Sequence, residues 1–262
     1  MIVGCALFAD WLPFIKDPNY LYGYWGDAPR SGNPSADYWL GTDIARRDVL
    51  ARLVFGARLA VFVAAVTVTV GGVVGGLLGS WAGFAGGRID TVIVGALDAV
   101  LAFPVMVLVI VLVAITEQRN LVLVSLLIGV AFVPMFARVA RATAMSVSRR
   151  EFVMAARAIG TTRTRILFRE VVPNVVPTLG AYAVAAAAIA IVIEASLAFI
   201  GFGAASRLPS WGRMILEARV DVRVTVYPMI YPSVVITLTV LSLNVVADWC
   251  RALTATRASA LA

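Results

Sequence analysis

Few side chains in this sequence are of a type that could carry out a reaction. The 262 residues include no histidine, which excludes Ser-His-Asp triads, histidine-ligated metals and axial histidine ligation of haem within the chain. The two cysteines, Cys5 and Cys250, lie near opposite ends, and no CxxC pair indicates a thiolate metal site or a redox centre. No GxxxxGKS or GxxxxGKT run is present, so we expect no ATP to bind through a P-loop here. We therefore predict no catalytic residue, no metal site and no cofactor in this chain.

Two acidic side chains, Asp98 and Glu194, lie inside long apolar stretches. An aspartate at the centre of a membrane helix costs about 2.5–3.5 kcal/mol, so such a group faces water or the interior of a helix bundle. One interpretation is a pathway or gating role, for which Asp98, Pro104, Glu194 and Ser196 are the candidates. The interpretation that we favour for both acids is a helix–helix hydrogen bond or an internal ion pair.

Basic residues are concentrated in one stretch, residues 136–172, against two glutamates, Glu151 and Glu170. The arginines of this stretch are Arg138, Arg141, Arg149, Arg150, Arg157, Arg163, Arg165 and Arg169. The net charge of +7 is compatible with nucleic acid binding, but in an apolar chain clustered arginines are typical of a cytoplasmic loop. We therefore expect no nucleic acid partner and predict that this stretch is cytoplasmic.

The elements that position these residues are predicted to be membrane helices. Apolar residues make up 61% of the chain and charged residues 14%, against about 45–50% and about 25% in soluble proteins. Apolar runs long enough to cross a bilayer, at about 20 residues each, cover residues 59–80, 91–115, 121–137, 175–200 and 224–247. Residues 1–15 are a sixth candidate, which is short or lacks its beginning. We expect an all-α membrane protein, a polytopic helical bundle of about six transmembrane helices.

Counting outward from the basic stretch gives the orientation of the remaining segments. Residues 16–58, 116–120 and 201–223 are expected outside, and residues 81–90 and both termini in the cytoplasm. The chain then divides into a first span with an external segment, a core that contains the cytoplasmic loop 138–172, and a cytoplasmic tail, at residues 1–58, 59–250 and 251–262. The external part includes an amphipathic stretch at 41–58, which suits a helix on the outer membrane surface or contact with a delivery protein.

Local signals within the basic stretch predict two short helices separated by a sharp turn. Ser148 followed three residues later by Glu151 fits a capping box, so a helix should begin there and run to Ile159. Gly160 then occupies the position where a glycine ends a helix in the left-handed conformation, and Thr162 can cap the second helix. We expect neither helix to be long enough to cross a bilayer.

Two interpretations of this short helix are open. Ala155 and Ala156 present almost no side chain, so another backbone can come close, and arginines flank this small surface. Such a surface suits docking of a cytoplasmic partner. The alternative is an interfacial amphipathic helix that grips anionic lipid headgroups.

Several stretches together resemble one known family. Residues 154–160, MAARAIG, and 170–173, EVVP, are similar to the EAA loop of bacterial ABC importer permeases. Further similar stretches, in order, are GTD at 41–43, RDVL at 47–50, RL at 52–53, GAR at 56–58, Asp98, AFP at 102–104, EASL at 194–197, FIGFG at 199–203 and PSWG at 209–212. The set spans roughly residues 38–251, most of the chain, and resembles the DppC-like subunits of the dipeptide/oligopeptide/nickel permease family. Met154 replaces the glutamate of the family's EAA triplet, and Arg46 stands where the family usually has glycine.

This resemblance implies a type I ABC permease fold with a cytoplasmic coupling helix, in a bacterial inner membrane. It implies a heterodimer with a second, DppB-like permease chain, two cytoplasmic ABC ATPase subunits that bind ATP and magnesium, and an extracytoplasmic substrate-binding protein. The chain itself would be non-catalytic and would form half of a pathway for dipeptides or oligopeptides by alternating access. The coupling residues carried over are Glu151, Met154, Ala155, Ala156, Arg157, Gly160 and Arg163.

Other functions stay open from the sequence alone. Related importers carry nickel, haem or other small solutes. An ion-coupled transporter that works alone is a second class, although the sequence shows no convincing internal repeat of the kind such folds often have. A membrane anchor without a pathway is a third class. An intramembrane enzyme is disfavoured, because this chain has no histidine and no closely spaced carboxylates in its predicted spans.

Overall fold

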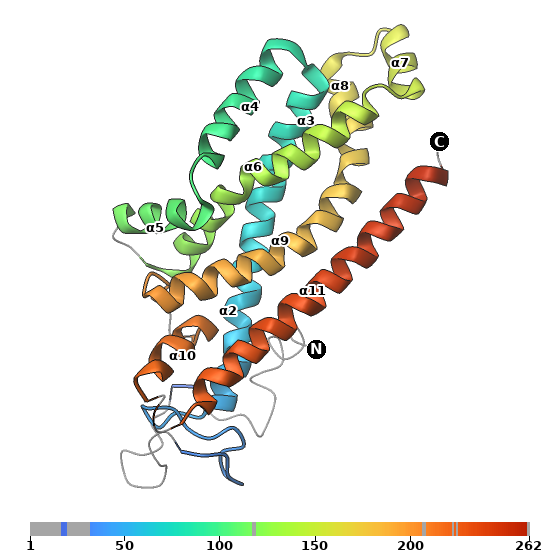
Figure 1. Cartoon of the computed structure of the whole chain (residues 1–262). Helices are drawn as coiled ribbons and strands as arrows, with labels where there is room; N and C mark the ends of the chain where they lie inside the picture. The colour runs from blue at the N-terminus through green and yellow to red at the C-terminus, as the bar shows by residue number, and fades with distance from the viewer. Residues whose placement is uncertain are drawn as a thin grey trace. The chain divides into compact units, whose positions relative to one another are not determined.

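The computed structural model describes residues 17–19, 32–116, 119–205, 208–221, 223 and 225–260, with side chains up to residue 253 (Figure 1). The predicted first span at residues 1–15 lies outside the described residues. Within them, the regular structure is helical, apart from one isolated bridge between Thr42 and Asp48. The predicted all-α class is confirmed.

The first described membrane helix is longer than predicted. α2 (Val49–Val70) continues through a π-helical turn (Gly71–Gly75) into α3 (Gly76–Ala85), and Val49–Ala85 is apolar enough to cross a membrane. The structure therefore differs from the expectation of a separate surface helix within residues 41–58, because helix α2 already begins at Val49. The Asp48 carboxylate fixes this start by accepting a hydrogen bond from the Leu50 N–H at 2.8 Å.

The second predicted span, residues 91–115, is broken. α4 (Gly87–Leu101) and α5 (Val105–Thr116) meet at an angle of 82°, and together they are long and apolar enough for one crossing or a re-entrant loop. Pro104 lies at the break. Proline has no backbone N–H and disfavours helical geometry at the preceding residue, here Phe103, so the helix ends before it.

The remaining helices extend the predicted spans into the basic stretch. α6 (Leu121–Val147) carries Arg138 and Arg141, which the sequence suggested for a loop. After α7 (Glu151–Ala158), the short α8 (Arg163–Ile166) and a π-helical turn (Leu167–Val171) run directly into α9 (Val172–Ile200). The predicted second short helix is therefore the first part of a membrane helix, Arg163–Ile200.

The chain ends with α10 (Trp211–Ala218), a 3-10 turn (Arg219–Asp221) and the long α11 (Tyr227–Ala260). Val49–Ala85, Leu121–Val147, Arg163–Ile200 and Tyr227–Leu253 are each long and apolar enough to span a membrane, and the bent α4–α5 pair is a fifth candidate. These helices support the predicted polytopic membrane bundle.

The chain forms two compact units, which we describe separately. The first contains residues 1–65, 112–125 and 188–242, and the second contains residues 66–111, 126–187 and 243–262.

In the second unit, glycines let α3 approach α6 closely. A Cβ atom at Gly79 would meet the carbonyl oxygen of Ala137, and one at Gly75 would lie 2.9 Å from the Cβ of Phe136. The Phe136 ring is fully buried and packs edge-to-face on Tyr182, with 4.9 Å between ring centroids. The close contacts favour helix packing as the role of these glycines.

In the first unit, α10 packs against α2 and α9. The indole N–H of Trp211 donates to the Leu53 carbonyl oxygen at 2.9 Å, and its ring lies over Gly56, where a Cβ would be only 2.7 Å away. Gly212 lies so close to the backbone of Ala195 that a Cβ there would overlap the Ala195 carbonyl oxygen. These contacts fix α10, which is too short to cross a membrane.

Candidate functional site

Helix α7 is anchored through a single buried side chain. Val153 is fully buried in an apolar cluster whose other members come from α6 and from residues 166–175, which run from the end of α8 into α9. These members are Ala140, Ala144, Val147, Ile166, Leu167, Val171 and Val175. Since the cluster holds both ends of the α6–α9 connection, α7 is fixed to two membrane helices although it crosses nothing itself.

The rest of α7 presents apolar side chains outward. Met154 is 53% exposed and Ile159, just after the helix, is 82% exposed. Ala155 is exposed and Ala156 partly so, as a close backbone approach requires. A short, anchored helix with large exposed apolar side chains is typical of a contact surface for another protein or a membrane.

The turn after α7 confirms the predicted role of glycine. Gly160 has a φ of +82°, its N–H donates to the Arg157 carbonyl oxygen at 3.0 Å, and the Thr161 N–H donates to the Ala156 carbonyl oxygen at 3.1 Å. This pair of bonds is a Schellman motif, which ends a helix with a left-handed residue. The chain can therefore reverse at once into the helix that begins at Arg163.

The predicted capping box is wrong. Arg150, not Ser148, occupies the N-cap position of α7, and no side chain caps the helix there. The Ser148 hydroxyl instead donates back to the Ala144 carbonyl oxygen at 2.6 Å, which satisfies it within the end of α6. Glu151 is the first residue of α7, where its charge is favourable near the positive end of the helix dipole.

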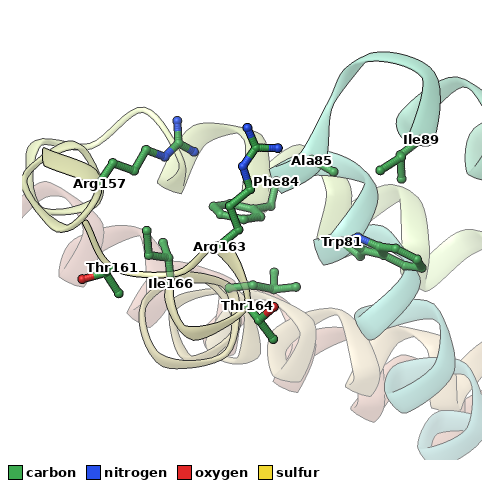
Figure 2. A pocket seen from close by; sticks show the side chains of 10 residues that line it. Trp81, Phe84, Ala85, Ile89, Arg157, Thr161, Arg163, Thr164 and Ile166 are labelled. Carbon is green, nitrogen blue, oxygen red and sulfur yellow. The ribbon is translucent and has the colours of Figure 1, made fainter. Parts of the chain in front are cut away.

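Two arginines of this segment, Arg157 and Arg163, lie beside aromatic side chains of α3. The guanidinium carbon of Arg157 lies 5.3 Å from the centroid of the Phe84 ring, a cation–π contact that fixes the end of α7 to α3. Arg157 and Arg163 also line a hollow of about 480 Å³ beside Phe84 and Trp81, shown in Figure 2. Neither arginine has a carboxylate partner within the described part of the chain.

The second unit also pairs acids with arginines between α4 and α6. Asp98 accepts from Arg138 at 2.6 Å, with both side chains about half exposed. Asp90 receives two hydrogen bonds from Arg141, at 2.5 and 2.6 Å. The Asp98 contact is of the structural kind that we favoured, while its candidate gating role stays a prediction. The sequence did not predict the Asp90 pair, since Asp90 was expected at the end of the cytoplasmic segment 81–90.

The first unit holds two of the other candidate pathway residues, Glu194 and Ser196. Glu194 on α9 is 2% exposed and accepts a hydrogen bond from the Ser210 hydroxyl at 2.8 Å. Ser196 donates to the Val192 carbonyl oxygen of its own helix at 2.7 Å. Pro104, in the second unit, is exposed at the α4–α5 break. Glu194 is thus bonded across elements, whereas Ser196 bonds only within its own helix.

A cluster of four charged side chains in the first unit escaped the sequence analysis. Arg47 joins Asp43 at 2.8 Å and Glu217 at 2.6 Å, and Arg52 pairs with Asp43 and, at 3.0 Å, with Glu217. Burial raises the pKa of the Glu217 carboxyl, but Arg52, Arg47 and Arg213 more than offset this, so its pKa is lowered from the ordinary value. We call Asp43, Arg47, Arg52 and Glu217 the charged cluster.

Known proteins resemble this chain over nearly its whole length. The family model described as "Binding-protein-dependent transport system inner membrane component" matches residues 75–259. The chain belongs to this family. The predictions of an ABC importer permease and of a multi-pass inner membrane protein are thereby confirmed.

Several known permeases are similar to this permease over almost its whole length. The dipeptide transport system permease protein DppC of Alkalihalophilus pseudofirmus is 34% identical over 96% of the chain and 82% of its own length. The glutathione transport system permease protein GsiD of Pectobacterium atrosepticum is 32% identical over the same shares. The di/tripeptide transport system permease protein DppC of Pseudomonas aeruginosa is 34% identical over 96% of the permease and 83% of the relative.

Proposed function

We propose that this permease is one of two membrane subunits of a peptide importer and that α7 is its coupling helix. The observation that carries the coupling role is the fixed geometry of α7. Val153 ties the helix to the ends of α6 and α9, and the Gly160 turn sets its direction. A displacement of the exposed Met154 and Ile159 by a bound protein would therefore be transmitted to two membrane helices, α6 and α9.

The partners follow from this role. Two cytoplasmic ATPase subunits would bind ATP and magnesium and receive α7, a DppB-like permease would form the other half of the pathway, and an extracytoplasmic binding protein would deliver the substrate. The chain itself would be non-catalytic. Glu151, Arg157 and Arg163 surround the exposed part of α7 and would select an ATPase surface of matching charge.

The substrate class rests on the relatives, which are named for dipeptides, di/tripeptides and glutathione. Nickel, haem or another small solute is the alternative. The test is uptake of a labelled dipeptide, glutathione and Ni²⁺ into proteoliposomes that contain the complete complex and internal ATP. We expect saturable uptake of a peptide that requires ATP and the binding protein. Uptake of Ni²⁺ alone would overturn the peptide assignment, and uptake by this chain in ATP-free vesicles would favour an ion-coupled transporter.

The orientation is a separate proposal. The arginine-rich α7 region, Cys250 and both termini would lie in the cytoplasm, and residues 32–48 outside. A membrane-impermeant thiol reagent applied to intact cells that carry Cys5→Ser should miss Cys250 and label Asn33→Cys, whose parent residue is exposed. The reverse labelling pattern would overturn this orientation.

A further inference from the structure

The hollow beside α7 has a mixed lining that packing alone does not explain. It encloses about 480 Å³ and combines aromatic, apolar, basic and hydroxyl side chains, chiefly Trp81, Phe84, Ile89, Arg157, Arg163 and Thr164. Figure 2 shows the Arg157 side chain extending toward that of Arg163, with the ring of Phe84 close by. Two positive groups in one hollow repel each other unless an anion joins them.

The two arginines are available for such an anion. Arg157 contacts the face of Phe84, and neither Arg157 nor Arg163 pairs with a carboxylate among the described residues. Arg138 and Arg141 in the same unit are by contrast held by Asp98 and Asp90. The positive charge of the hollow is therefore not neutralised from within the described part of the chain.

The position of the hollow indicates where the anion comes from. Its walls are the ends of membrane helices, since one span ends at Ala85, α4 begins at Gly87 and another span begins at Arg163. Side chains at the ends of membrane helices are expected at the level of the lipid headgroups. Trp81 is 49% exposed on this wall, and tryptophan is enriched where a bilayer meets water. An apolar wall beside two cations suits a molecule that is anionic at one end and apolar at the other.

We propose that this hollow binds the phosphate headgroup of an anionic phospholipid. Arg157 and Arg163 would contact the phosphate, and Trp81 and Ile89 the glycerol and the first acyl carbons. Basic pockets between membrane helices on the cytoplasmic side bind such headgroups in other proteins. Met154 and Ile159 do not line the hollow, so lipid can occupy it while a protein contacts these two side chains. Arg157 and Arg163 would then contact the lipid phosphate, and Glu151 would carry the charged contact with the ATPase.

The test is lipid binding by the purified full-length chain, measured by native mass spectrometry at increasing phosphatidylglycerol or phosphatidylcholine. We expect tighter binding of phosphatidylglycerol. Each arginine near an anionic headgroup contributes about fivefold to binding, so Arg157→Gln/Arg163→Gln should weaken it by about thirtyfold. The matched control Arg149→Gln/Arg165→Gln removes the same charge from exposed residues outside the hollow and should change binding by less than about threefold.

Two further comparisons make the result decisive. Arg157→Lys/Arg163→Lys keeps the charge and should retain most of the binding, whereas a loss equal to that of the glutamine variant would contradict a charge-based site. Inorganic phosphate or glycerol 1-phosphate that displaced the lipid at equal concentration would show a soluble anion as the ligand and overturn the lipid assignment. Equal weakening in the control variant would also overturn it. Because the readout is lipid binding, it does not depend on coupling to an ATPase.

Discussion

The charged cluster and the α7 segment, residues 150–163, use polar side chains in opposite ways. In the charged cluster, two carboxylates and two guanidinium groups pair with one another, and Arg52 is almost fully buried. In the α7 segment, Glu151, Arg157 and Arg163 are exposed, and one apolar side chain, Val153, provides the anchor. The first arrangement stabilises the chain, and the second leaves its charges available to other molecules. Mutations should therefore damage stability in the first region and partner contacts in the second.

The largest effect is expected where α10 packs against α9. Gly212→Ala would place a Cβ on the Ala195 carbonyl oxygen, and two backbones cannot yield as a flexible side chain can. We expect a loss of about 3 kcal/mol in stability, the upper end of typical overpacking costs, measured by thermal unfolding in detergent. Gly180→Ala is the control, since nothing lies within 4 Å of a Cβ there, and it should be neutral or slightly stabilising. Equal effects of both changes would refute this packing.

The next effect concerns the charged cluster. Glu217→Gln removes the negative charge that Arg47 and Arg52 share, at a cost of about 2 kcal/mol, typical of hydrogen bonds to charged groups. Thermal unfolding should show the loss without a change in ATPase association of the molecules that remain folded. Selective loss of association in a variant of normal stability would contradict the division between the two regions.

The same cluster predicts a dependence on pH. Because the pKa of Glu217 is lowered in the folded state, its contribution to stability is complete above the ordinary carboxyl pKa and is lost as pH falls through the folded-state value. The unfolding temperature of the wild type should therefore drop below about pH 4 more steeply than that of Glu217→Gln. Parallel curves for the two proteins would show that Glu217 does not carry this effect.

In the α7 segment, Gly160→Val should affect coupling more than stability. A valine at a φ of +82° costs about 1–2 kcal/mol in backbone strain, and no atom lies within 4 Å to clash with its Cβ. We expect normal membrane abundance but reduced ATPase stimulation by loaded binding protein in the reconstituted complex. Gly160→Asn is the matched control, because asparagine tolerates this conformation better. Wild-type stimulation and uptake in Gly160→Val would favour a lipid-surface role for the segment.

The smallest effect is expected at the exposed apolar side chains. Ile159→Ser should change the unfolding free energy by less than about 0.5 kcal/mol, as is usual for surface positions. Association with the ATPase, measured by co-purification over a dilution series, should weaken by about fivefold through lost apolar contact. Unchanged association would remove Ile159 from the docking surface.

The contrast between the charged cluster and the α7 segment also explains which features could be predicted from the sequence. Gly160 and the helix before it depend on neighbours within a few residues, so the turn was predictable. The role of Ser148 was not, because its hydroxyl could bond forward to α7 or back to Ala144, and only the packing of α6 decides. The charged cluster joins Arg47 to a residue 170 positions away, a pairing that no local pattern indicates.

The predicted segment boundaries were wrong for a related reason. The predicted apolar runs overlap the long helices and the bent α4–α5 pair, but α2 and α6 extend beyond their runs. Polar residues near a helix end are compatible with both a loop and a helix. Ion pairs such as that between Arg141 and Asp90 stabilise the helical conformation there. Composition therefore predicted the bundle, and tertiary contacts set where each helix begins and ends.

The central claim, that α7 contacts the ATPase, is tested most directly by cross-linking. In a chain carrying Cys5→Ser and Cys250→Ser, Ala155→Cys places a thiol on the exposed part of α7, and Asn33→Cys places one in the segment proposed to lie outside. After treatment of the assembled complex with a short bis-maleimide, we predict a cross-link from position 155 to the ATPase subunit and none from position 33. An intact, active complex in which position 155 gives no such product, or in which position 33 gives it equally, would contradict the claim.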